Sequence, residues 1–216
     1  MWKIFEPDGT LGRILSWIGD LILLNLLWLV CSLPVVTAGA STAALHAVLQ
    51  RRLLNEDESG MIRGFFPAFR ANFRRATAAW LILLALIALC WLNFRAAALL
   101  DGFVWRVAAG VGAVLLALEL TGIFPLLARY ENTLGNQMKN AMLFSVGNLP
   151  RVLLLWLLEG GFAALALVPE LTRHVLALCL FLAVSGFAAL ETLLLRKPFA
   201  RLESAQSEQD GENGSE

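Results

Sequence analysis

Several polar side chains of this sequence lie inside long apolar runs, where a charge has chemical consequences. They are Asp20, Asn25, Glu119, Glu159 and Glu191. An ionised side chain at the centre of a lipid bilayer costs about 3 kcal/mol on insertion scales, so such residues face a bundle interior or a wet cavity. The functional interpretation is a path for protons or cations, or a cavity for a polar solute. The structural interpretation is hydrogen bonding between helices by neutral carboxyl groups. Both interpretations are open.

Three of these carboxyl groups can be placed in depth. Counting from the nearest flanking arginine at ~1.5 Å per residue puts Glu119 and Glu159 at depths of ~15 Å and ~12 Å, and Glu191 at ~7 Å. No Lys or Arg stands at a matching depth in any apolar run. We therefore expect these groups to be protonated, hydrogen-bonded or hydrated, with Glu119 and Glu159 near one level.

The remaining reactive residue types do not form a catalytic or metal-binding pattern. The three cysteines, Cys31, Cys90 and Cys179, lie in separate apolar runs, and His46 and His174 stand apart from them and from each other. The sequence contains no zinc-ligand spacing, no HExxH motif and no GxSxG nucleophile elbow. It therefore predicts no enzyme, no cofactor and no metal site.

Composition and run length predict the fold class. Of the 216 residues, 58% are apolar and 16% are charged, against about 45–50% and about 25% in soluble domains. This balance disfavours a soluble enzyme and a nucleic-acid-binding protein. We expect an all-α polytopic membrane bundle of about five transmembrane helices with cytoplasmic amphipathic helices, forming one domain over residues 1–202. The predicted spans are residues 15–34, 77–94, 107–128, 152–169 and 175–195.

The basic residues predict an orientation, because Lys and Arg favour the cytoplasmic side. With five spans, one side carries five of them: Lys3, Arg13, Arg95, Arg106 and Arg173. The other side carries twelve: Arg51, Arg52, Arg63, Arg70, Arg74, Arg75, Arg129, Lys139, Arg151, Arg196, Lys197 and Arg201. We therefore expect a multi-pass protein of the bacterial cytoplasmic membrane with its N-terminus outside and its C-terminus in the cytoplasm.

A break in the helical pattern follows the first span. Its residues are Pro34, Thr37, Gly39, Ser41 and Thr42. Proline and glycine interrupt a helix, and a Ser or Thr hydroxyl can cap the next one. Capping by Ser41 or Thr42 is the favoured interpretation. The alternative is an anion bound at the new helix start, but a nucleotide is not expected because the lysine and spacing of a P-loop are missing.

A stretch before the second span is both aromatic and basic. Phe65, Phe69 and Phe73 recur at four-residue spacing, and the arginines Arg70, Arg74 and Arg75 lie away from that stripe. This pattern is typical of a helix lying in the membrane interface. A helix packed on the cytoplasmic ends of the spans explains it equally well. At the other end of the chain, residues 203–216 are acidic and polar, which predicts a disordered tail.

Three runs resemble the bacterial YesL family: residues 20–49 (DLILLNLLWLVCSLPVVTAGASTAALHAVL), residues 65–77 (FFPAFRANFRRAT) and residues 124–150 (FPLLARYENTLGNQMKNAMLFSVGNLP). The first run carries the most specific part, SLP followed by TxGxST. The resemblance implies a small bacterial integral membrane protein without an established activity. Family members are often encoded near carbohydrate ABC transporters, regulators and polysaccharide-degrading enzymes, which implies a role in sugar uptake or its control.

Two functions are therefore expected. The first is a non-enzymatic accessory protein that lies in the lipid bilayer and contacts carbohydrate ABC transporter or sensor subunits through its Arg/Phe helices. The second is a small solute or proton-coupled transporter that uses the intramembrane carboxylates. Neither involves nucleic acid.

Overall fold

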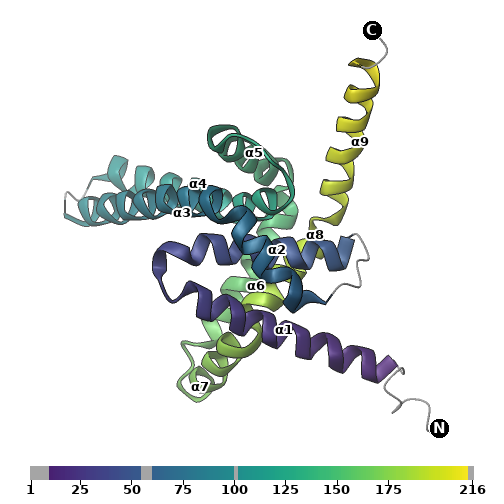
Figure 1. Cartoon of the computed structure of the whole chain (residues 1–216). Helices are drawn as coiled ribbons and strands as arrows, with labels where there is room; N and C mark the ends of the chain where they lie inside the picture. Colours follow the sequence, from purple (N-terminus) through teal and green to yellow (C-terminus); the bar gives the residue numbers. More distant parts are fainter. Residues whose placement is uncertain (1–9, 55–59, 100–101, 214–216) are drawn as a thin grey trace.

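The structure is a computed structural model that describes residues 10–54, 60–99 and 102–213, and every regular element in these residues is helical (Figure 1). The elements are α1 Thr10–Ser32, the 3-10 turn η2 Val35–Thr37, α2 Ala38–Leu54, α3 Met61–Leu99, α4 Phe103–Arg129, α5 Leu134–Gly147, α6 Leu149–Leu165, α7 Pro169–Leu178, the π-helix η3 Cys179–Ala183, α8 Val184–Leu194 and α9 Arg196–Asn213.

Four helical segments of the described chain are long and apolar enough to cross a membrane: Leu11–Ser32, Met61–Leu99, Phe103–Arg129 and Pro169–Leu194. A fifth candidate is the pair α5 and α6, which is bent by 88° at its break. The predicted all-α polytopic fold is therefore confirmed. The predicted fourth span, 152–169, corresponds to α6, which ends at Leu165 because residues 166–168 turn before Pro169 begins α7.

Helix α2 lies at the centre of the bundle, in contact with α1, α3, α4 and α8. Every residue from Gly39 to Gln50 except Thr42 is buried. The small side chains of this helix allow the close approach. A Cβ added at Gly39 would lie 2.4 Å from the Cβ of Trp80 and 2.6 Å from the Ala76 carbonyl oxygen. The segment is thus far more enclosed than a surface amphipathic helix.

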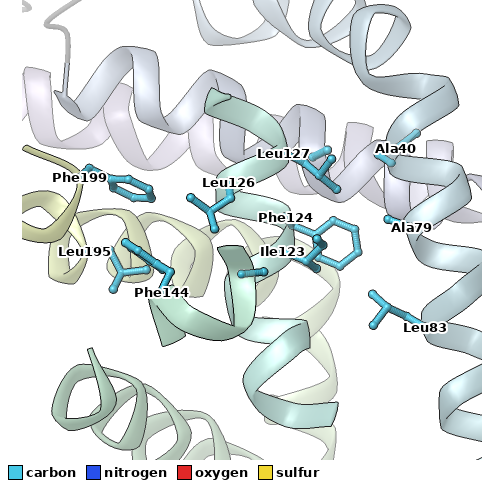
Figure 2. Packing of buried hydrophobic residues seen from close by; sticks show 13 residues of the cluster. Ala40, Ala79, Leu83, Ile123, Phe124, Leu126, Leu127, Phe144, Leu195 and Phe199 are labelled. Carbon is cyan, nitrogen blue, oxygen red and sulfur yellow. The ribbon is translucent and has the colours of Figure 1, made fainter. Parts of the chain in front are cut away.

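A second part of the core surrounds the last turns of α4 (Figure 2). In that view α4 residues lie between side chains of α2 and α3 on one side and, on the other, side chains of α5 and α9 with Leu195, which stands between α8 and α9. The labelled members are Ala40, Ala79, Leu83, Ile123, Phe124, Leu126, Leu127, Phe144, Leu195 and Phe199. This cluster fixes α4, and with it one wall of the cavity described below.

Helix α3 continues without interruption through the predicted interfacial stretch and the second span. Its 39 residues correspond to ~58 Å at ~1.5 Å per residue, about twice the hydrocarbon thickness. Phe65 is fully buried against α2 residues, Phe69 is partly buried, and Phe73 is 37% exposed. Packing on neighbouring helices therefore explains the buried end of the phenylalanine stripe. Arg70 and Arg74 are exposed beside it.

Helices α1 and α2 form a hairpin whose two ends can be located. At the closed end, the Trp80 indole N–H donates to the Val35 carbonyl at 2.7 Å. At the open end, Arg13, Asp20 and Arg52 line one pocket. The five-span scheme places Arg13 and Arg52 on opposite sides of the membrane, and the structure brings them to the same end because α2 folds back along α1.

The last residues of α4 also lie at the open end of the α1–α2 hairpin. The Gln50 side chain, in the last turns of α2, donates to the Pro125 carbonyl, in the last turns of α4, at 2.9 Å. Figure 1 shows the turn between α1 and α2, the last residues of α3 and the first residues of α4 on the left of the view, away from the first residues of α1. The first residues of α1 and the last residues of α2 and α4 therefore share one end.

Helix α9, Arg196–Asn213, extends into residues 203–216, where the sequence predicts a disordered tail; disorder of that stretch stays a prediction. It reaches Asn213, and only residues 214–216 lie outside the described chain. Phe199 is fully buried and stacks on Phe144 with ring centroids 5.1 Å apart, and the Glu203 carboxylate accepts a hydrogen bond from Arg129 at 2.8 Å. With the first turns fixed in this way, each added residue costs little, so the helix propagates into the polar sequence.

The hairpin predicts which positions share a side of the membrane. In a cysteine-free background, Thr10→Cys and Gly60→Cys should react with an impermeant maleimide from the same side, and Gly102→Cys from the opposite side. The physical reason is that α1 and α2 return the chain to its starting end. Labelling of Thr10→Cys from the same side as Gly102→Cys would contradict this arrangement.

Candidate functional site

A cavity of about 400 Å³ lies between α2, α4, α6, η3 and α8. Its lining is mostly apolar, with polar side chains from several helices. The polar members are Thr42, His46, Thr121, Glu159 and Glu191. No Lys or Arg is among its lining residues. Ligand sites are commonly clefts of this kind, with a few polar groups in an apolar wall.

The most enclosed polar pair of the cavity is His46 of α2 and Glu191 of α8. The His46 Nε2 and the Glu191 Oε2 are 3.6 Å apart, a close contact that is longer than a hydrogen bond. His46 Nδ1 and Glu191 Oε1 are buried and have no hydrogen-bond partner in the described residues. His46 is 4% exposed, and burial in an apolar bundle favours the neutral imidazole over its charged form.

Glu159 of α6 lines the same cavity. Three titratable side chains from three helices therefore meet at one space. The sequence singled out both glutamates but missed His46, because 145 residues separate it from Glu191. One signal was present: Thr42 and His46 are four residues apart, which places both on one face of a helix.

Two threonines of the cavity are held by tryptophans. Trp28 donates to Thr42 Oγ1 at 3.0 Å, and Trp156 donates to Thr121 Oγ1 at 2.9 Å. Each threonine in turn donates its hydroxyl to the carbonyl four residues earlier in its own helix. The two hydroxyl protons are therefore already engaged, and neither is free to donate to a ligand.

Asn25 of α1 supports the π-helix that forms part of the cavity wall. Its Nδ2 donates to the carbonyls of Cys179 and Leu180 at 3.2 and 2.9 Å, and its Oδ1 accepts from the Ser185 backbone N–H at 2.9 Å. A π-helix leaves backbone groups out of the α-helical pattern, and such segments are frequent at functional sites. Asn25 thus satisfies groups that lipid could not.

The other predicted intramembrane residues lie elsewhere. Glu119 is 5% exposed with an unpartnered Oε1, and it lines a separate cavity of about 370 Å³ with Cys90 and Asn93. Asp20 lines the pocket with Arg13 and Arg52. The structure therefore brings Glu159 and Glu191 together and does not place Glu119 with Glu159 in one cavity.

The helix break after α1 is a packing feature. Thr37 donates to the Cys31 and Pro34 carbonyls at 2.6 and 2.8 Å, and Ser41 donates to the Thr37 carbonyl at 3.1 Å. Helix α2 begins at Ala38, so the predicted capping by Ser41 or Thr42 is wrong. The 3-10 turn runs directly into α2, and the hydroxyls satisfy carbonyls of the turn instead.

Comparison with known proteins gives two similarities. A family model described as "Protein of unknown function, DUF624" matches residues 21–94. The chain is 28% identical over 175 residues to "Uncharacterized protein YteU" of Bacillus subtilis (strain 168), an alignment that covers 76% of this chain and 78% of that protein. No solved structure matches. The family match includes Asn25, Thr42 and His46, and it ends before both cavity glutamates.

Replacing Asn25 tests its support of the π-helix. Asn25→Leu should lower the free energy of unfolding by about 2–4 kcal/mol, because two carbonyls and one N–H lose their partner in an apolar surrounding. Thermal unfolding in detergent measures the change. Asn93→Leu is the matched control, since this amide makes no hydrogen bond with the described chain. Equal stability of both variants would contradict the role of Asn25.

Proposed function

We propose that this membrane protein binds and moves a small polar solute through the cavity between α2, α4, α6 and α8, with proton exchange at the cavity carboxyl groups of Glu159 and Glu191. One observation carries the proposal: titratable side chains of three helices converge on one cavity that has no basic lining residue. In an apolar bundle such groups are costly, and their retention favours a function at that place.

The structural interpretation of these carboxyl groups explains less of what is seen. A glutamate that joined two helices would have both oxygens paired, yet Glu191 Oε1 has no partner in the described chain. The facing His46 Nδ1 is unpartnered too. A solute or water molecule that enters the cavity supplies the missing partners, which is how buried polar groups are ordinarily satisfied.

Helix α6 is a wall of the cavity that buries few of its side chains. Its buried residues are Val152 and Leu155, and Glu159 lies on its exposed part. The Trp156–Thr121 hydrogen bond joins it to α4. A wall with so few buried contacts can shift at little cost, so movement of α6 would open the cavity while α2 and α4 stay in place.

The distribution of Lys and Arg residues supports an orientation with both the N-terminus and the C-terminus in the cytoplasm. Once α2 returns the chain, Arg13 joins the basic side, and 13 of the 16 described Lys and Arg residues lie there. The other side holds Arg95, Arg106 and Arg173. This split is steeper than twelve to five, and the bacterial cytoplasmic membrane is the setting that the positive-inside rule favours. This proposed orientation differs from the N-terminus-outside orientation that the five-span count predicts.

A second candidate is a non-enzymatic accessory role in carbohydrate uptake. It rests on the resemblance of residues 20–49, 65–77 and 124–150 to the YesL family, to which we assign the chain as part of this proposal. The exposed arginines Arg63, Arg70 and Arg74 of α3 offer a basic surface for a carbohydrate ABC transporter or sensor subunit. This role and the solute cavity are compatible.

Flux measurements test the transport proposal. In proteoliposomes that contain a pH-sensitive dye, the unmutated chain should move protons when a solute from a panel of sugars, amines and inorganic cations is added outside. Glu191→Gln should reduce this movement to the level of empty liposomes, because glutamine cannot release a proton.

Glu119→Gln is the matched control for that experiment, since it makes the same change in a separate cavity. It should keep its flux. An equal loss in both variants, or no flux above empty liposomes with any solute of the panel, would contradict the proposal.

The accessory role predicts a stable partner. Affinity purification in mild detergent, with neighbouring membrane proteins co-expressed, should recover a transporter or sensor subunit. Reversal of charge at Arg70 and Arg74 to Glu should remove it, because an acidic partner surface would then be repelled. Recovery that is unaffected by this reversal would exclude the basic surface as the contact.

A further inference from the structure

We infer that the ligand of the cavity is a small organic ammonium ion, held by Glu159 and Glu191 with its apolar part against the phenylalanines of the wall. The inference rests on the proposed function only in using the same cavity. It assigns a chemical class of ligand, which the proposal leaves open.

The charges of the cavity favour a cation. Two carboxyl groups line it, and no Lys or Arg is among its lining residues. An anionic ligand would meet two acidic side chains without a compensating positive charge. A cation instead favours the ionised form of each carboxyl group. Its entry therefore releases protons from Glu159 or Glu191 to the solvent, which gives solute entry a direct link to proton movement.

The hydrogen-bonding groups of the cavity point the same way. Both threonine hydroxyls already donate to backbone carbonyls. With its Nε2–H directed at Glu191, neutral His46 presents Nδ1 as an acceptor, and this atom has no partner in the described chain. Once the carboxyl groups have released their protons to the solvent, the available groups are acceptors. An ammonium group supplies N–H donors, whereas a sugar would leave its own oxygen atoms without donors.

The apolar wall suits the remainder of such a ligand. Phe124, Phe162 and Phe187 line the cavity, and the last two are in edge contact with ring centroids 5.4 Å apart. Aromatic faces attract cations, and they also pack against apolar groups. A metal ion fits less well, because the described residues hold no group of three His, Cys, Asp or Glu side chains arranged to bind one. A volume of about 400 Å³ suits a small amine with one ring.

Calorimetric titration of the purified full chain in detergent tests the inference with three probes of similar shape. Benzylammonium should bind saturably at neutral pH, whereas benzyl alcohol and benzoate should not. Repeating the titration in buffers of different ionisation enthalpy should reveal proton release on binding. Preference for benzoate, or equal binding of benzyl alcohol, would overturn the inference, because the carboxyl groups would then not be recognising a charge.

Variants separate the site from general partitioning into the detergent. Glu191→Gln should weaken benzylammonium binding about tenfold or more, because a charge-assisted hydrogen bond is lost. Glu159→Gln, at a more exposed position, should do the same and serves if the buried variant fails to fold. Glu119→Gln should bind as tightly as the unmutated chain, and an equal loss in this control would overturn the assignment to the cavity.

The two proposals fail in different ways. No saturable benzylammonium binding overturns the ammonium inference, while proton flux driven by another solute would still support transport. Specific binding of benzylammonium without flux of any solute supports the ligand class and overturns transport.

Discussion

The arrangement of this molecule depends on the need to cover α2. Its sequence between Ala38 and Leu49 consists largely of alanine and small polar residues, with His46 in the middle. Such a helix gains little from contact with lipid, and its histidine would be costly there. It is buried among α1, α3, α4 and α8, which themselves present large apolar side chains outward. The longer helices thus surround α2 and keep it from direct contact with the lipid hydrocarbon, where it would be unfavourable.

The small residues that permit this burial also determine where helices approach closely. Gly39 against Trp80 and Gly122 against the Ala141 carbonyl leave no room for a Cβ. Around the cavity the packing is different, because α6 contributes few buried residues and η3 departs from α-helical geometry. Tight packing on one side of α2 and looser packing on the other leave a space beside His46. The cavity is therefore a consequence of how unevenly α2 is covered.

The sequence predicted those features that depend on local pattern. Apolar runs of sufficient length identified α1, α3, α4 and the α7–α8 segment, because the hydrocarbon thickness sets the length of a span. The central position of α2 was not predictable in this way. A helix of alanines and small polar residues has the sequence pattern of a surface helix, and only its contacts with neighbouring helices show that it is buried. Orientation depends on the same information, because α2 folds back along α1 and brings Arg13 and Arg52 to one pocket.

The residues of the site likewise fall into those that one segment of sequence reveals and those that depend on contacts between distant segments. Glu159 and Glu191 were noticed because a carboxyl group in an apolar run is rare. Such a residue can be recognised from its own segment of the sequence. The contact of Glu191 with His46, and the support of η3 by Asn25, join residues that are more than 100 positions apart. Only the way in which the chain returns through α2 brings those partners together. Helix α2, which has to be buried, thus also supplies the one imidazole that lines the cavity. The need to bury α2 therefore places the titratable His46 beside a space that the carboxyl groups of Glu159 and Glu191 also line.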